Sequence, residues 1–236
     1  MGQKVSPTGF RLGVTEDWRS RWYSDKDYAK NLENDLAIRK FLEKQLAHAA
    51  VSRVEIERAG DKIKVIITTS RPGVVIGKKG AEVDALRKKL NQIANGTVSV
   101  EVVEVKRPEL DANLIAQSIA EQLENRVAFR RAMRKAVQSA RKSGAKGIRI
   151  QCAGRLGGAE MSRREWYREG RVPLHTLRAK IDYGFATAAT TMGSIGIQVW
   201  VYHGEVLPGQ KAPQPALEGS SRPNRRGRRN NDRGDK

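Results

Sequence analysis

The most informative segment of this sequence is Val74-Val75-Ile76-Gly77-Lys78-Lys79-Gly80-Ala81-Glu82-Val83. Its pattern predicts the end of an apolar helix, a tight turn and the start of a second helix. Glycine at both ends of the turn lets the backbone come very close to another molecule, because no Cβ lies in the way. Lys78 and Lys79 add positive charge beside a helix N-terminus, a combination that suits the sugar-phosphate backbone of a nucleic acid.

The segments around this turn predict a small α+β domain. A helix is expected over residues 27–50, where apolar positions recur mostly three or four residues apart: Leu32, Leu36, Phe41, Leu42 and Leu46. Apolar and polar residues alternate over residues 53–57 and 62–67, which predicts a hairpin. A second helix after the turn and a strand over residues 98–105 complete the domain.

The order helix, strand, strand, helix, turn, helix, strand resembles the prokaryotic-type (type II) KH fold. In KH domains a Gly-x-x-Gly loop clamps the nucleic-acid backbone, and the matching residues here are Gly77, Lys78, Lys79 and Gly80. The tetrad alone is weak support, because the same spacing recurs later in the chain. Among these tetrads, only this one lies between two apolar helical patterns in the right order.

Two other structures could account for these glycines. A P-loop requires four residues between its first two glycines, followed by Lys and then Ser or Thr to hold Mg²⁺. Gly73 and Gly77 enclose three residues, and Lys79 occupies the position of the Ser or Thr, so a P-loop is excluded. A tight turn between two helices, without a ligand, remains the alternative to an RNA-binding loop.

The charge balance of the chain points to a polyanionic partner. Forty-five Lys and Arg residues face 26 Asp and Glu residues, which gives a net charge of +19, and such self-repulsion does not stabilise a soluble domain. Nucleic acid is the first interpretation and an anionic membrane surface the second. No run approaches the roughly 20 apolar residues of a membrane-spanning helix. No apolar signal segment follows Met1, so we expect a cytoplasmic protein.

Catalytic and metal-binding chemistry finds little support in the sequence. Cys152 is the single cysteine, so no disulfide framework and no cysteine-based metal site is expected. His48, His175 and His203 lack the spacing of metal ligands, and Asp111 starts a helix, where capping explains it. An enzyme acting on nucleic acid would need metal-binding carboxylates or an activated nucleophile. We therefore expect no enzyme activity, cofactor, metal or small-molecule substrate.

A second domain is expected to begin near Pro108, because proline disfavours helix in the residue before it. Its second helix, about residues 128–142, has apolar residues on one arc and no acid on the opposite arc. That basic arc consists of Arg130, Arg131, Arg134, Lys135, Arg141 and Lys142. It is either a solvated helix face or a positive ridge along a nucleic-acid backbone. The absence of i,i+4 ion pairs favours the ridge.

Strands of the second domain are expected where apolar residues alternate with polar ones, over residues 148–152, 177–183 and 195–201. Residues 166–177 between them are basic, aromatic and turn-rich. The second domain is therefore predicted to be α+β, with two helices against a mainly antiparallel sheet.

The predicted division of the chain has four parts. They are an irregular N-terminal arm (1–16), the KH domain (17–106), the second α+β domain (107–206) and a disordered, basic, RNA-binding tail (207–236).

Residues 18–23, at the start of the KH domain, mix aromatic residues with arginines. These side chains could stack on bases or anchor the preceding arm onto the domain.

Several segments resemble the bacterial small-subunit ribosomal protein S-three family. They are Met1-Gly2-Gln3-Lys4-Val5, Phe129-Arg130-Arg131-Ala132-Met133, residues 154–160 and residues 165–177. The similarity covers about residues 1–207. Two unrelated domains in the right order make it specific.

The resemblance implies a structural protein of the head of the small ribosomal subunit, bound to small-subunit rRNA. It implies S-ten and S-fourteen as neighbours, with S-four and S-five nearby around the opening through which mRNA enters. In that family, basic residues of the second domain's helix face incoming mRNA and help to unwind it. The matching positions are Arg130, Arg131 and Arg134, with Lys135 adjacent on the same face. The competing class is a free-standing KH regulator of mRNA, which would not co-sediment with small subunits.

Overall fold

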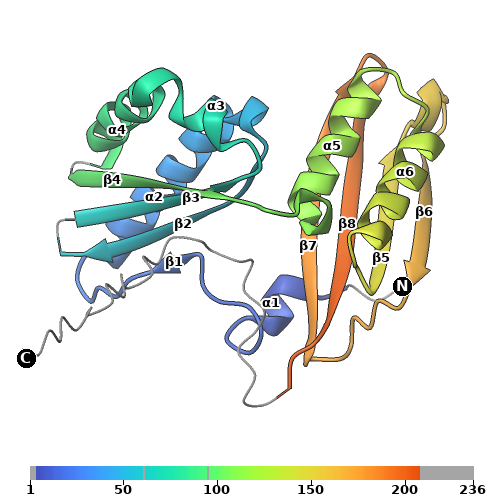
Figure 1. Cartoon of the computed structure of the whole chain (residues 1–236), viewed down its shortest axis with the longest axis horizontal. Helices are drawn as coiled ribbons and strands as arrows, with labels where there is room; N and C mark the ends of the chain where they lie inside the picture. Colours follow the sequence, from blue (N-terminus) through green and yellow to red (C-terminus); the bar gives the residue numbers. More distant parts are fainter. Residues whose placement is uncertain (1–3, 61, 95, 208–236) are drawn as a thin grey trace, which may run out of the picture.

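The computed structural model describes residues 4–60, 62–94 and 96–207 of the chain. Figure 1 shows two lobes side by side, each built on its own sheet. Each sheet has four strands, and each lobe buries a separate apolar cluster. The predicted α+β class with two domains is confirmed, whereas the exact domain boundaries stay predictions. The predicted basic tail lies outside the described residues, except for Leu207.

The first lobe has the element order that the sequence predicts. From the first long helix onward, the order is helix, strand, strand, helix, helix, strand. The first two of these three strands pair antiparallel, and the last strand pairs parallel with the one before it. Its elements are β1 (Ser20–Arg21), α2 (Tyr28–Gln45), β2 (Val51–Ala59), β3 (Lys62–Thr69), α3 (Pro72–Ile76), α4 (Ala81–Ala94) and β4 (Thr97–Glu104).

The buried face of α2 differs from the predicted one. The spacing of apolar residues places Leu32 and Leu36 in the core, but both are exposed, Leu36 to 59%. Ile38 and Leu42 form the buried face instead. The same face continues through Asp35, whose 1% exposure shows that a carboxylate occupies a position that hydrophobic periodicity assigns to an apolar residue.

Asp35 is buried because it is the acceptor for three donors from two other segments, the chain around β1 and strand β2. It accepts hydrogen bonds from Ser20 Oγ at 2.9 Å and from Trp22 Nε1 at 2.8 Å, and it forms an ion pair with Arg58 Nη2 at 2.6 Å. These bonds fix the segment that contains β1 against α2 and β2. The sequence left base stacking and anchoring open for the aromatic residues of this segment. Trp22 anchors the segment to the first lobe.

The N-terminal arm is more ordered than predicted. Residues Pro7–Arg11 form a short helix, α1, and Arg11 is buried against the second lobe rather than exposed as a charge of an irregular arm. Its guanidinium donates to the backbone oxygens of Ala179 at 2.7 Å, Leu174 at 2.9 Å and Thr176 at 3.0 Å. Because a guanidinium has five donors, carbonyl oxygens can satisfy it without a carboxylate. The spacing of apolar residues cannot predict this interaction, because the arm is held by hydrogen bonds of one charged side chain.

The second lobe places two helices on one face of an antiparallel sheet, as predicted. The strand order is β6-β5-β8-β7, and every neighbouring pair is antiparallel. The elements are α5 (Ala112–Glu124), α6 (Phe129–Lys142), β5 (Gly147–Gly154), β6 (Arg163–Gly170), β7 (Ala179–Thr190) and β8 (Gly193–Glu205).

Strand β6 is another element that the sequence analysis does not predict. The reading treats residues 166–177 as turn-rich, yet the segment up to Gly170 pairs with β5 along its whole length. As an edge strand, β6 exposes most of its side chains and carries charges on both faces, so it lacks the apolar alternation that marks a half-buried strand.

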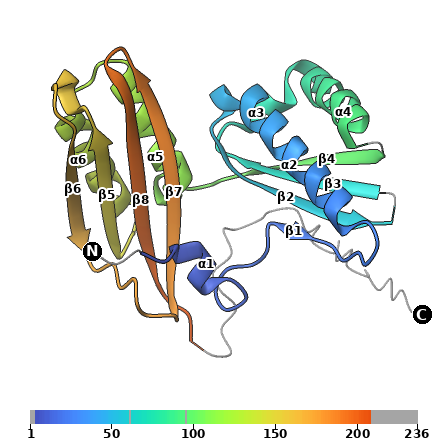
Figure 2. The ribbon, with the colours of Figure 1, turned by 180° about the vertical axis from the view of Figure 1, so that it is seen from behind.

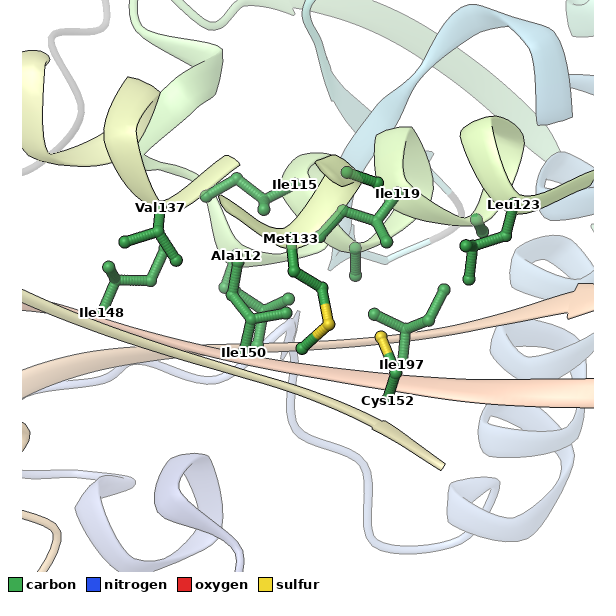
Figure 3. Close-up of a cluster of buried hydrophobic side chains, with 14 of the residues drawn as sticks. Ala112, Ile115, Ile119, Leu123, Met133, Val137, Ile148, Ile150, Cys152 and Ile197 are labelled. Atoms are coloured by element: carbon green, nitrogen blue, oxygen red, sulfur yellow. The ribbon is translucent and has the colours of Figure 1, made fainter. Parts of the chain in front are cut away.

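The core of the second lobe lies between the helices and the sheet. Figure 3 shows Met133 of α6 and Ile119 of α5 pointing toward Ile150 and Ile197 of the sheet, with Cys152 beside them. Burial raises the pKa of the Cys152 thiol to about 12, so this cysteine is an apolar packing residue rather than a reactive one.

Polar side chains join the two lobes. Asn113 Nδ2 donates to the backbone oxygen of Ser52 at 3.1 Å, and Gln117 Nε2 donates to that of Val51 at 3.0 Å. Asp111 caps α5 by accepting from Leu114 N at 3.0 Å, as predicted, and also accepts from the Ser52 hydroxyl. Burial and the nearby Asp182 raise the pKa of Asp111.

Met133→Ala should lower the free energy of unfolding by about 2–5 kcal/mol, because it leaves a cavity in a closed core. Met161 is a matched control, since its side chain is 83% exposed, and Met161→Ala should change the stability by less than about 0.5 kcal/mol. Urea unfolding followed by circular dichroism measures both values. Equal effects of the two substitutions would contradict the placement of Met133.

Candidate nucleic-acid interface

The Gly-x-x-Gly turn sits between α3 and α4 as the sequence predicts. Helix α3 ends at Ile76, and Gly77 has φ 70° and ψ −177°, a conformation nearly restricted to glycine. A Cβ on Gly77 would also come within 2.8 Å of the Cβ of Glu82 in the first turn of α4. Gly80 has φ 82° and open space around it. The first glycine therefore allows α3 and α4 to pack, and the second allows the turn itself.

The surface of this turn combines charge with apolar groups. Lys78 is exposed, and Val74 and Ile76 at the end of α3 are also exposed although Val75 is fully buried. A shallow groove beside the turn is lined by Val74, Gly77, Lys78 and the start of α4. The side chain of Lys79 lies outside the described part of the structure. Gly73 belongs to α3 rather than to a loop, so the structure also excludes a P-loop.

Helix α6 has the amphipathic structure that the sequence predicts. Ala132, Met133, Val137 and Ala140 are buried against α5 and the sheet. The opposite arc is exposed and contains Arg130, Arg131, Arg134, Lys135, Arg141 and Lys142. The basic residues are thus on the outside of a helix that is fixed by its core, which is a requirement for a phosphate-binding surface.

The basic arc is less free of acids than the helix sequence alone indicates. Strand β6 places Glu165 and Glu169 next to α6, where they pair with Arg130 and Arg141, each at 3.3 Å. Arg163 also pairs with Glu165, at 2.9 Å. The hydrogen bond from Arg130 holds the pKa of Glu165 below its ordinary value. These ion pairs could not be found from helix periodicity, because their acids come from the missed strand.

Three of the predicted RNA-binding residues on α6 have no acidic partner among the described residues. Within the described part of the chain, Arg131, Arg134 and Lys135 form no ion pair, and all three are exposed. At a rise of about 1.5 Å per residue they cover about 6 Å of one helix face. Arg131, Arg134 and Lys135, here called the α6 cation triplet, are therefore the strongest candidates for anion binding on α6. Arg130 is a weaker candidate than the sequence suggests.

The described ranges contain no group of three or more His, Cys, Asp or Glu residues that could hold a metal ion. They also contain no helix long and apolar enough to cross a membrane. The histidines do not gather into a site. Burial lowers the pKa of His203 to about 4, with Lys180 adding to the effect, so this imidazole is neutral at physiological pH.

A glycine-framed turn between two helices, an α-β-β-α-α-β lobe around it and an exposed cationic helix on a second lobe define a two-domain RNA-binding protein. Comparison with protein families agrees with this class. A family described as "KH domain" matches residues 37–110, and one described as "Ribosomal protein S3, C-terminal domain" matches residues 119–201.

Curated relatives cover most of the chain. The chain is 63% identical over 211 residues to "Small ribosomal subunit protein uS3" of Geobacter sulfurreducens, an alignment that covers 89% of this chain and all of the relative. It is 60% identical over 211 residues to the protein of the same name from Syntrophus aciditrophicus, covering 89% of this chain and 98% of the relative. The chain belongs to the small ribosomal subunit protein uS3 family.

Gly77→Ala should destabilise the first lobe by about 1–3 kcal/mol, because alanine disfavours this backbone conformation and its Cβ collides with Glu82. Gly73 is the matched control, since it lies in α3 with open space where a Cβ would be. Gly73→Ala should be neutral or stabilise the lobe by up to about 1 kcal/mol. Thermal unfolding of both variants tests the distinction, and a harmless Gly77→Ala would show that the turn does not need glycine there.

Proposed function

We propose that this chain holds RNA in the small ribosomal subunit and that α6 faces mRNA where it enters the ribosome and helps to unwind it. The observation that carries the proposal is the α6 cation triplet, which is exposed on a rigid helix and shares its charge with no described carboxylate. Membership of the uS3 family makes the chain a structural, RNA-binding component of translation rather than an enzyme, and it places the chain with the cytoplasmic ribosome.

The proposed mechanism is electrostatic and involves no covalent step. Arginine and lysine side chains bind phosphates as displaced counterions enter the solvent, so binding needs no particular base sequence. A protein surface that holds single strands competes with base pairing and thereby favours the open form of a structured mRNA. Arg131, Arg134 and Lys135 act as this surface, and Arg130 contributes less because Glu165 shares its charge.

The KH turn supplies the second proposed contact. Gly77 and Gly80 keep the backbone free of Cβ atoms where RNA would approach, and Lys78 extends into solvent beside them. Lys79 is assigned to the same contact from its place in the motif. We assign small-subunit rRNA to this turn and mRNA to α6, which separates the two ligands onto different lobes.

The neighbours S-ten and S-fourteen, with S-four and S-five nearby, are also part of the proposal and are supported by the family resemblance. A free-standing KH regulator of mRNA is disfavoured, because the "Ribosomal protein S3, C-terminal domain" family matches the second lobe. Co-sedimentation of the chain with small subunits from cell extracts distinguishes the two functions.

Replacing Arg131, Arg134 and Lys135 together by alanine should flatten the dependence of single-stranded RNA binding on salt. Each lost phosphate contact lowers the slope of log K against log salt by about 0.7 for single strands, so the expected change is about two. Fluorescence titrations at several salt concentrations measure it. The control is Arg130→Ala with Arg141→Ala, two arginines already paired with acids, which should change the slope by less. An unchanged slope in the triple variant would reject the α6 proposal.

In reconstituted ribosomes the same triple variant should slow translation through a stable mRNA hairpin while leaving unstructured mRNA unaffected. Equal rates on both messages, or an equal loss on both, would count against a role in unwinding.

Lys78→Asp combined with Lys79→Asp should weaken rRNA binding several-fold, because two attractive charges become repulsive ones. The melting temperature should stay unchanged, since the turn is on the surface. Lys40→Glu combined with Lys44→Glu, on the exposed side of α2, reverses the same amount of charge elsewhere on the lobe and should have a smaller effect. Unfolding of the turn variant would show instead that the turn is structural.

A further inference from the structure

The sheet of the second lobe has one face that α5 and α6 leave uncovered. Figure 2 shows β6, β5, β8 and β7 in front of the two helices, with α1 near only one end of the strands. Strand pairing places one set of side chains on this face. The central part of this set, here called the open face, is Arg164, Trp166, Arg168, Arg149, Gln151, Ala153, Gly196, Gln198, Trp200, Tyr183, Phe185 and Thr187.

Ring and guanidinium stacking organises one half of the open face. The guanidinium of Arg149 lies between two indoles, 5.4 Å from the ring centre of Trp166 and 5.0 Å from that of Trp200. Tyr183 continues the row, with its ring centre 5.5 Å from that of Trp200. Four strands thus contribute to one continuous layer of π systems, Trp166 from β6, Arg149 from β5, Trp200 from β8 and Tyr183 from β7.

A chain of hydrogen bonds runs beside the stacked row. Arg149 Nη2 donates to Gln151 Oε1 at 3.1 Å, Gln151 Nε2 donates to Gln198 Oε1 at 2.9 Å, and Gln198 Nε2 donates to the Tyr183 hydroxyl at 3.2 Å. These bonds fix the rotamers of the layer before any ligand arrives. A ligand that stacks here therefore meets an ordered surface, which lowers the entropy lost on binding.

Two aromatic rings of the open face remain available. Trp166 is 55% exposed and Phe185 is 56% exposed, whereas Trp200 is largely buried beneath its neighbours. The other end of the same face is already occupied, because Val172 and Leu174 pack there against Ile181 and Tyr202. The exposed aromatics are therefore confined to the part of the face that no described segment covers.

Charge on β6 is sorted between its two faces. Glu165 and Glu169 lie on the helix side, where they pair with α6, while Arg164 and Arg168 lie on the open side. None of the described residues that make up the open face is an aspartate or a glutamate. The branched aliphatic side chains of this side of the sheet, Ile181 with Val172 and Leu174 packed against it, gather at one end, so the open face itself is mainly aromatic, amide and cationic.

We propose that the open face is a third RNA-binding surface, on which unpaired bases stack. Trp166 and Phe185 each take a base, and Arg164 and Arg168 bind the phosphates beside them. Aromatic rings on a sheet with flanking cations bind single-stranded RNA because every base has a π face. The basic tail of the same chain is a poor occupant for this face, because its Arg225, Arg226, Arg228 and Arg229 carry the same charge as Arg164 and Arg168. The inference goes beyond the proposed function, since it uses no residue of α6 or of the KH turn.

The test uses the full-length chain and a fluorescein-labelled oligouridylate of roughly ten nucleotides, a length within the site sizes of such surfaces. Measurements at high salt suppress binding that depends on phosphate alone. Trp166→Ala and Phe185→Ala should each weaken binding roughly tenfold. Tyr28→Ala is the matched control, because Tyr28 is an aromatic residue 57% exposed at the start of α2 on the other lobe, and it should bind within about twofold of the unchanged chain.

Duplex RNA of the same length separates stacking from charge. The duplex offers no unpaired base, so its affinity should be the same for Trp166→Ala and the unchanged chain, while the α6 triple variant should weaken duplex binding at low salt. Oligouridylate binding that survives in both aromatic variants would overturn the proposal, as would equal losses for single-stranded and duplex RNA. Normal oligouridylate binding with loss of a neighbouring protein from reconstituted small subunits would show a protein interface instead. Phe185→Ala on β7 guards against local unfolding of β6 in Trp166→Ala.

Discussion

The repulsion among its own cations constrains how this chain folds. The chain has a net charge of +19, and several of its 26 carboxylates connect elements of the structure. Asp35 joins α2, β2 and the segment of β1 through Ser20, Trp22 and Arg58. Glu165 and Glu169 join α6 to β6. Acids used for connection are not available to neutralise the surface, so excess positive charge collects on particular faces.

Arg11 shows a second way to accommodate positive charge. It is buried with backbone oxygens as hydrogen-bond acceptors, and no carboxylate of the described residues forms an ion pair with it. Burial lowers the pKa of Arg11, and the charge of Glu16 partly opposes this shift. The cost of burying a charge is offset here by several hydrogen bonds to the loop before β7. This one side chain fastens the arm to the lobe that lies farthest from it in the sequence.

Sequence reasoning succeeds here where hydrophobic period and glycine position decide the structure. The element order of the first lobe, the Gly77–Gly80 turn and the amphipathic α6 all follow from spacing, because burial of one face dictates each of them. It fails where polar contacts decide. Asp35 replaces an apolar residue in the buried face of α2, and β6 shows no alternation because it is an edge strand with two charged faces.

Those failures also affect the candidate site. The α6 arc lacks acids only when β6 is taken for a loop. The sequence therefore overestimates Arg130 as an RNA-binding residue, because its ion pair with Glu165 comes from β6. The open face of the second sheet is likewise invisible until β6 is known to be a strand. Its residues come from four strands, and their common direction depends on register, which the sequence alone does not provide.

The junction between the lobes consists of amide side chains and a capped helix end rather than an apolar cluster shared by the described parts of both lobes. Hydrogen bonds of Asn113 and Gln117 can be exchanged for water at small net cost. The arm that runs from Arg11 on the second lobe to β1 on the first is therefore the stronger link between the lobes. Rotation of one lobe against the other is limited by the length of chain between Arg11 and Ser20, which acts as a tether.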